Sequence, residues 1–304
     1  MSKLTPAQAI TVNSTTAAVS TYDEWASDHG TYSVADNVKI TVTGSGVLEE
    51  EYECLAEHEA SAGTNPATDT TNWLDTGASN AYKMFDDLVS SQTEKATSIV
   101  VDITPADRVD ELALFNVFGE TVAVVCKSGV TEVYNESHSL DNTIIRDWLE
   151  YFYNPFDLSS DLVVEIPGLY PTLTINVTVM YTGATAKVGH LAVGLSQDIG
   201  KAQYSPSVSI ADYSAKATND FGETYLNQRA YAKTVGCVLN IDSVNFDAIA
   251  TRLAAVRATP AVWQINNSST DYSSLIVWGF FKDFDLLLQS NNLSTCSLEI
   301  EGLI

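Results

Sequence analysis

Short stretches in which apolar and polar residues alternate recur along the chain and indicate a mainly β protein. Residues 38–42 and 173–179 alternate regularly, which is the pattern of strands with one buried face. Residues 112–118, 121–126 and 276–281 are apolar with few interruptions, which favours strands that are buried on both faces. Gly, Asn, Asp and Ser separate these stretches, as expected for turns.

Two segments have helical spacing instead. Residues 142–153 place large apolar side chains four residues apart, and Pro155 follows as a stop signal. Residues 244–257 present one apolar face and are followed by Pro260. We therefore predict one helix in each segment.

Composition shifts divide the chain into three predicted units. Residues 1–79 contain 12 acidic and 2 basic residues, and the turn-forming residues 75–80 close this part. A weaker boundary lies near Gly200. We therefore expect domains at residues 1–79, 80–200 and 201–304.

The net charge limits the partners of the chain. The 304 residues include 15 Lys and Arg and 39 Asp and Glu, a net charge of −24, which repels nucleic acid and anionic membrane surfaces. No apolar run approaches the roughly 20 residues of a spanning helix. The first residues lack the apolar region of a secretory signal, so we expect the chain to mature in a reducing cytosol.

The cysteines and the acidic run are expected to be structural. Four cysteines lie far apart without a C-x-x-C pair, which favours buried thiols over disulfides or a zinc site. Cys54 and His58 have ligand spacing, but two residues without a second pair are weak support for zinc. The glutamates of residues 49–59 predict a solvated acidic edge, with a cation site as the alternative. We expect no metal and no cofactor.

No catalytic motif is present in the sequence. It lacks a nucleophile elbow, an H-E-x-x-H helix, a P-loop and a dinucleotide-binding glycine motif. Asp86 and Asp87 are adjacent and would point to opposite faces of a strand, and Asp283 and Asp285 are expected at the surface. His190 lies in an apolar run and is expected in the core or at an interface. We predict that the protein is not an enzyme, with a glycan-degrading enzyme as the least favoured alternative.

Residues 22–77 carry the most specific pattern of the chain, with Trp25, Tyr32, Tyr52 and Trp73 in a fixed order. This segment resembles the small chitin- and cellulose-binding modules of carbohydrate-binding families 5 and 12. The resemblance implies that one or two of these aromatic residues stack on a sugar. The alternative is that all four form the core of a module too small to be built from aliphatic residues.

Two further segments resemble proteins of bacteriophage tails. Residues 80–87, with the sequence NAYKMFDD, are similar to the opening of a β-sandwich in tail proteins of double-stranded DNA phages. There it directly follows a carbohydrate-module-like domain. Residues 201–304 resemble the sheet-plus-helix fold of tail-tube and distal-tail proteins. The expected fold is mainly β: a small aromatic-rich β module, a jelly-roll-like β-sandwich, and a C-terminal β-sheet domain with one helix.

The implied function is structural. We expect a component of the virion tail, near the tip or baseplate, that is assembled in the host cytoplasm and contacts other tail proteins. A host adsorption protein that binds surface glycan through the aromatic module is the alternative.

Aromatic residues next to the first predicted helix indicate an interface. Tyr151, Phe152, Tyr153 and Phe156 lie within six residues, and successive helical positions point about 100° apart. One helix face cannot bury all of them, so we expect neighbouring copies or other tail proteins to cover them. Closed symmetry is the default for such contacts, and we expect a trimer or a hexamer.

Overall fold

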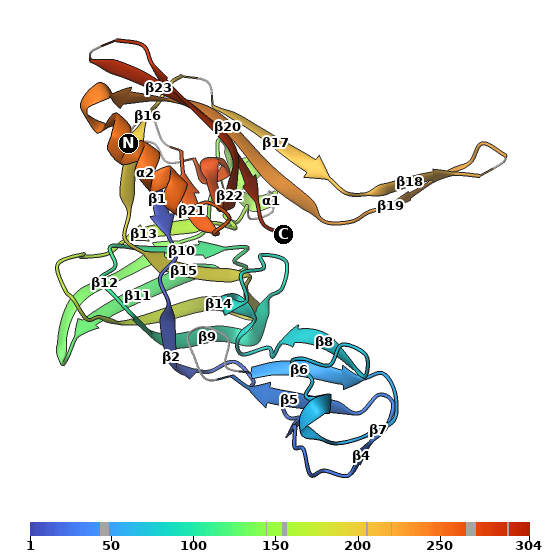
Figure 1. Ribbon diagram of the computed structural model, residues 1–304. Helices are drawn as coiled ribbons and strands as arrows, with labels where there is room; N and C mark the ends of the chain where they lie inside the picture. The colour runs from blue at the N-terminus through green and yellow to red at the C-terminus, as the bar shows by residue number, and fades with distance from the viewer. Residues whose placement is uncertain are drawn as a thin grey trace.

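Three β-rich units make up the chain, and Figure 1 shows them as a barrel, a sandwich and a small module. The computed structural model describes residues 1–42, 49–143, 145–153, 157–204, 206–219, 221–265, 272–290 and 292–304. The predicted fold class is confirmed, because the chain is mainly β and combines a β-sandwich with a sheet-and-helix unit.

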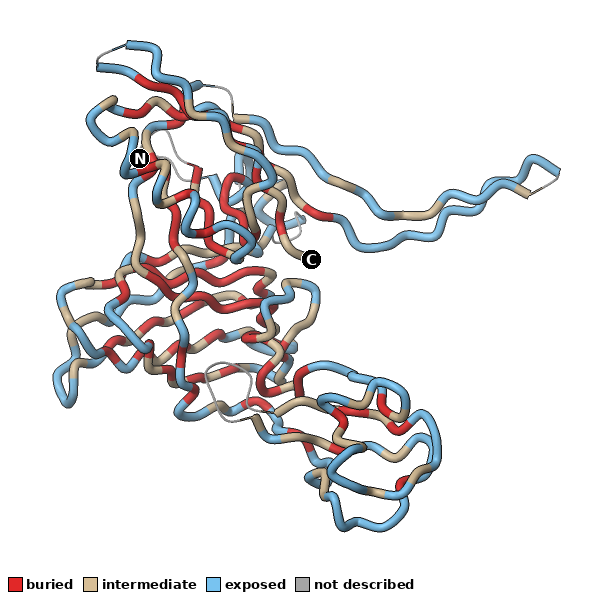
Figure 2. Tube along the Cα trace, viewed as in Figure 1, coloured by how far each residue is buried: buried red, intermediate tan, exposed pale blue. Residues whose placement is uncertain are grey.

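The sandwich consists of two antiparallel sheets. The larger sheet has the order β12-β11-β14-β9-β2, and the smaller has the order β13-β10-β15. The larger contains β2 (Ile10–Thr15), β9 (Thr93–Pro105), β11 (Thr121–Ser128), β12 (Thr131–Ser139) and β14 (Thr174–Val188), and the smaller contains β10 (Glu111–Phe115), β13 (Leu162–Glu165) and β15 (His190–Gly194). Alternate residues of β9, including Ile99, Val101 and Ile103, are buried in the core between the sheets. Figure 2 shows this buried layer in red.

The C-terminal unit is a closed barrel. Its strands follow the order β16-β1-β21-β22-β23-β20, and β16 also pairs with β20, which closes the ring. An additional strand, β17, pairs with the first half of β20. The strands are β1 (Ser2–Pro6), β16 (Gln197–Ala202), β17 (Ser207–Asp212), β20 (Tyr231–Asp242), β21 (Ala261–Gln264), β22 (Ile276–Leu288) and β23 (Leu293–Gly302).

Helix α2 (Phe246–Ala255) packs on the barrel core through Ile249 and Leu253. One turn of 3-10 helix, Ser243–Asn245, precedes it. The predicted helix at residues 244–257 is therefore confirmed, with slightly shorter bounds.

The barrel and the sandwich share a packed joint. Phe115 and Ala192 of the sandwich lie in one buried cluster with Val262 and Trp278 of the barrel. The indole Nε1 of Trp278 donates a hydrogen bond of 3.1 Å to the backbone oxygen of Asp87. Apolar burial and this polar contact together fix the two units relative to each other.

The first fifteen residues do not belong to the small module. Strand β1 pairs with β16 and β21 in the barrel, and β2 pairs with β9 in the sandwich. The predicted domain of residues 1–79 therefore differs from the structure at its N-terminal end. The start of the module is set by the pairing of β1 and β2 with strands far away in the sequence, and composition contains no information on such pairing.

The module has a four-stranded sheet of order β3-β5-β6-β8 and a two-stranded sheet of β4 and β7. These strands are β3 (Asp23–Glu24), β4 (Thr31–Tyr32), β5 (Asn37–Thr41), β6 (Glu49–Cys54), β7 (His58–Glu59) and β8 (Trp73–Ala78). The chain enters and leaves the module beside the sandwich (Figure 1), so the module is an insertion between β2 and β9.

Helix α1 is shorter than predicted and spans Trp148–Tyr153. The backbone N–H of Thr143 donates to the side chain of Asp141, and that of Asn142 donates to the Asp157 carbonyl. These bonds hold the preceding backbone outside the helix. The helix begins after Asp147, whose Oδ1 accepts a 2.8 Å bond from the Glu150 N–H. The prediction that the helix begins at residue 142 is therefore wrong.

Candidate functional site

The four aromatic residues proposed for glycan binding form the core of the module. Tyr32, Tyr52 and Trp73 are only 2% to 4% exposed, and Trp25 packs partly buried against them. The Trp73 ring meets the Tyr32 ring edge-on at 5.0 Å between centroids, and its Nε1 donates to the Thr64 carbonyl at 2.9 Å. A sugar stacks on an exposed ring face, and the three buried rings offer none.

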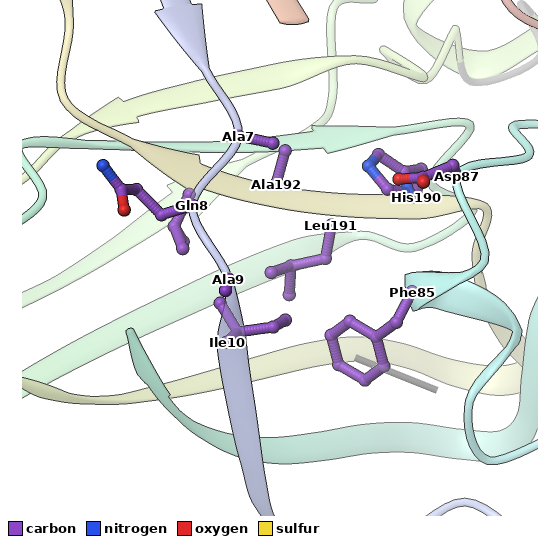
Figure 3. A pocket seen from close by; sticks show the side chains of 10 residues that line it. Ala7, Gln8, Ala9, Ile10, Phe85, Asp87, His190, Leu191 and Ala192 are labelled. Carbon is purple, nitrogen blue, oxygen red and sulfur yellow. The ribbon is translucent and has the colours of Figure 1, made fainter. Parts of the chain in front are cut away.

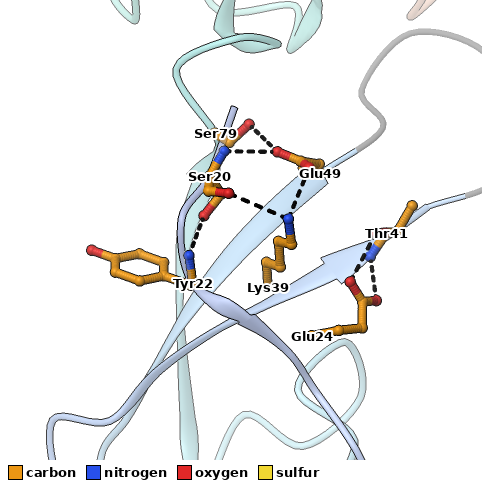
Figure 4. Close-up of polar contacts among 7 residues, drawn as sticks. All are labelled: Ser20, Tyr22, Glu24, Lys39, Thr41, Glu49 and Ser79. Atoms are coloured by element: carbon orange, nitrogen blue, oxygen red, sulfur yellow. Dashed lines mark hydrogen bonds and ion pairs between the residues drawn. The ribbon is translucent and has the colours of Figure 1, made fainter. Parts of the chain in front are cut away.

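A half-buried carboxylate ties the two ends of the module together (Figure 4). Glu49 forms a 3.1 Å ion pair with Lys39 and accepts hydrogen bonds from Ser20 N–H at 2.9 Å and Ser79 Oγ at 3.0 Å. Burial opposes ionisation of Glu49, but these three donors lower its pKa below the ordinary value. The charged carboxylate therefore has a structural role, since Ser20 and Ser79 lie where the chain enters and leaves.

The predicted acidic edge and the Cys54–His58 pair are not assembled into a metal site. His58 Nδ1 lies 2.8 Å from the Ala56 carbonyl and 3.7 Å from Cys54 Sγ, so its N–H is used by the backbone oxygen. Within the described residues, no three His, Cys, Asp or Glu side chains converge in a way that could hold a metal ion.

All four cysteines are free and buried, which confirms the prediction made from their spacing. Burial raises the pKa of Cys126 and of Cys296 to about 11. These thiols therefore remain protonated at neutral pH and are poor nucleophiles.

His190 lies at the joint between the sandwich and the barrel. Its ring stacks on Trp278 with centroids 4.3 Å apart, and its Nδ1 is buried without a hydrogen-bond partner among the described residues. Burial lowers the pKa of His190 to about 3, so the imidazole is neutral at physiological pH. The expectation of a core or interface histidine agrees with this position.

A cavity of about 220 Å³ lies beside His190 (Figure 3). Asp87 and His190 lie together at one side of it, and the backbone of residues 7–10 crosses the other. The remaining lining is mainly Ala, Ile, Leu, Val and Phe85. One neutral imidazole and one carboxylate offer hydrogen bonds, but no hydroxyl or thiol nucleophile lines this cavity.

The carboxylate pairs considered in the sequence have different surroundings. Asp86 accepts hydrogen bonds from Ser91 Oγ at 2.6 Å and from Leu88 N–H at 2.9 Å. Burial raises the pKa of both Asp86 and Asp87 above the ordinary value. Asp283 and Asp285 are exposed on β22, as predicted.

The α1 surface, defined as Trp148, Leu149, Tyr151, Phe152 and Tyr153, is the largest cluster of exposed aromatic residues on a single described element. These side chains are 59% to 79% exposed. The rings of Trp148, Tyr151 and Phe152 contact one another and leave their outer faces in solvent. Three predicted interface residues therefore lie in this patch, while Phe156 lies outside the described residues.

A second exposed apolar surface lies on a two-stranded ribbon that sequence reasoning did not identify. Strands β18 (Ala215–Thr218) and β19 (Thr224–Asn227) pair with each other and project far from the barrel (Figure 1). Phe221 is 92% and Leu226 is 77% exposed. The adjacent residues Tyr225 and Leu226 place apolar side chains on both faces of β19, a pattern that in sequence more often indicates a buried strand than an exposed one.

Comparison of the chain with protein-family models, curated proteins and solved structures finds no match. None of the helices in the described part of the chain has the length and apolarity to span a membrane. The candidate functional features are therefore two exposed apolar surfaces, one on α1 and one on the β18–β19 ribbon.

Proposed function

We propose that this chain is a structural component of a bacteriophage virion tail, near the tip or baseplate, that acts through protein–protein contacts in a symmetric assembly. The α1 surface carries the proposal. Five large side chains, each about two-thirds exposed, present roughly 700 Å² of mostly apolar surface if each one has about 200 Å². Patches of this size on soluble proteins usually mark an interface.

The exposed area of the α1 surface is of the size found in specific protein–protein interfaces. A stable protein–protein contact covers roughly 800 Å² on each partner. The α1 surface alone approaches this area, and Trp and Tyr are the residues that contribute most often to interface affinity. The partners we propose are further copies of this chain and other tail proteins.

The fold supports a structural role for the surfaces. The joint around Trp278 connects the barrel to the sandwich, so α1 and the ribbon are held on one framework. The four free thiols fit assembly in the reducing cytoplasm of a host.

The class of assembly comes from the sequence resemblance, which includes residues 80–87 and 201–304. The alternative, an adsorption protein that binds glycan, receives less support, because Tyr32, Tyr52 and Trp73 are buried. The net charge of −24 fits a tail component that does not retain DNA.

Labelling of purified particles tests the proposal. Phage particles released from cells that carry the coding sequence are purified by density, and gold-labelled antibodies against this chain are located by electron microscopy. We expect label at the tail tip or baseplate and peptides of the chain in the particle digest. Absence from the particle, or label on the capsid alone, would contradict the proposed function.

A further inference from the structure

We propose that the β18–β19 ribbon of one copy docks on the α1 surface of a second copy of this chain. The inference rests on the proposed function, since it names one contact within the symmetric assembly. It assigns an occupant to each of the two exposed apolar surfaces.

The ribbon projects away from the rest of the described chain (Figure 1). Its two strands form a separate two-stranded sheet, and an isolated ribbon of this kind is marginally stable in water. The ends of the two strands are tied together, because Asn219 Oδ1 accepts bonds from the N–H groups of Phe221 and Glu223 at 3.0 and 2.8 Å. A ribbon that carries the exposed residues Phe221, Tyr225 and Leu226 fits a segment that is buried in an assembly.

The two surfaces differ from each other, which favours a head-to-tail contact. The ribbon is a narrow projection, whereas α1 is a single helical turn and a half with aromatic residues on several sides. When a projection of one copy meets a different surface of the next, the contact repeats around a ring if the rotation closes. A ring is the expected form of a symmetric tail component.

The charges of the two surfaces favour a second copy as the occupant. Within the ribbon, residues 215–227, Lys216 lies on β18, whereas the acidic residues Asp220 and Glu223 fall between the two strands in the sequence. Residues 141–157 contain four acidic residues and one basic residue. Two copies repel each other over most of their surface, whereas Lys216 is a cation that the acidic residues around α1 attract.

One face of the ribbon combines a cation with an apolar side chain. Lys216 and Leu226 are directly opposed in the antiparallel register and therefore share a face. Next to the aromatic rings of the α1 surface lie Asp147, which directly precedes the helix, and Glu150 in its first turn. Lys216 approaching these carboxylates while Leu226 contacts the rings would satisfy both the charged and the apolar groups.

Intermolecular disulfide formation in the full chain tests this contact. One sample carries Thr224→Cys, which lies on the Leu226 face, and the other carries Tyr153→Cys, which leaves Trp148 and Phe152 in place. The Thr224→Cys sample is labelled with ¹⁵N, so that a crosslink between two different chains can be recognised by mass. The two samples are then mixed and oxidised mildly, and the crosslinked peptides are identified by mass spectrometry. The native thiols are buried and do not compete.

The matched control replaces Tyr153→Cys by Val130→Cys, because Val130 is fully exposed in the turn between β11 and β12. We expect the Thr224–Tyr153 pair to give about tenfold or more crosslink than the Thr224–Val130 pair, since a disulfide requires Cα atoms within roughly 7 Å. The oligomeric state of the unmodified chain is measured in parallel by sedimentation velocity.

The outcomes separate the two proposals. If the chain self-associates and the two pairs crosslink equally, the ribbon–α1 contact is wrong and the proposed function stands. If the chain is found in particles but stays monomeric and forms no crosslink, α1 and the ribbon contact other tail proteins and this inference is overturned. If the chain is absent from particles, the proposed function fails whatever the crosslinks show.

Discussion

Replacement of His190 by Phe is expected to remove an acid-sensitive element from the joint between sandwich and barrel. In the folded chain burial lowers the pKa of His190 from 6.5 to about 3. Below pH 6.5 the unfolded chain binds a proton at this position and the folded chain does not, so acid favours unfolding. At 1.36 kcal/mol per pKa unit, lowering the pH from 7 to 4.5 costs about 2.5 kcal/mol through this group alone.

Neighbouring carboxyl groups act in the opposite direction. Burial raises the pKa values of Asp86, Asp87 and Glu111 in the folded chain. As the pH falls, the folded chain therefore binds protons at these groups before the unfolded chain does, and acid favours the folded state through them. These groups are present in both the parent and the His190→Phe protein. The difference between the two proteins therefore isolates the histidine.

Urea unfolding followed by tryptophan fluorescence at about pH 7 and about pH 4.5 measures this difference, because Trp278 stacks on His190. We expect the variant to lose about 2.5 kcal/mol less than the parent between the two pH values. His29→Phe is the matched control, since His29 also stacks on an aromatic ring, Tyr32, but is exposed. An equal loss in parent and His190→Phe protein would refute the reasoning.

Three further predictions concern stability and charge. Trp73→Ala should destabilise the module by ~3–5 kcal/mol in thermal unfolding, because the ring is buried; unchanged stability with loss of chitin binding would instead support the glycan alternative. Gly279→Ala should lower the free energy of unfolding in urea by ~1–3 kcal/mol or more, since a Cβ at this position would lie 2.1 Å from the Glu301 carbonyl oxygen. Gly63→Ala is the control and should leave the stability nearly unchanged, because the nearest atom to its Cβ would lie 3.8 Å away. The chain should not shift duplex DNA in a gel at about 0.1 M salt, and a clear shift would show that local basic groups outweigh the net charge.

Local patterns predicted the elements better than their assembly. Alternation at residues 173–179 identified the first part of β14, and the apolar face of residues 244–257 identified α2, because both signals come from a single element with one buried face. The closure of β16 on β20 and the separate destinations of β1 and β2 depend on pairing between distant residues, such as Lys201 with Asn240, Ile10 with Pro105 and Ser2 with Gly200. No local pattern contains that information.

Of the two candidate surfaces, the sequence predicted the α1 surface and missed the ribbon. Tyr151, Phe152 and Tyr153 were identified because three consecutive large residues cannot share one buried helix face. The ribbon was missed, since its short strands have no core of their own and adjacent apolar residues such as Tyr225 and Leu226 usually indicate burial on both faces. In the module, the sequence order of Trp25 to Trp73 could not decide between a core and a sugar-binding face, and burial in the structure favours the core.

A reconstruction of the phage tail by electron cryomicroscopy, with this chain placed in the map, tests the central claim most directly. We predict that the chain lies at the tip or baseplate and that Trp148, Phe152 and Tyr153 lose most of their accessible surface to another chain. A map in which these side chains remain open to solvent would contradict a role that depends on protein–protein contacts at α1.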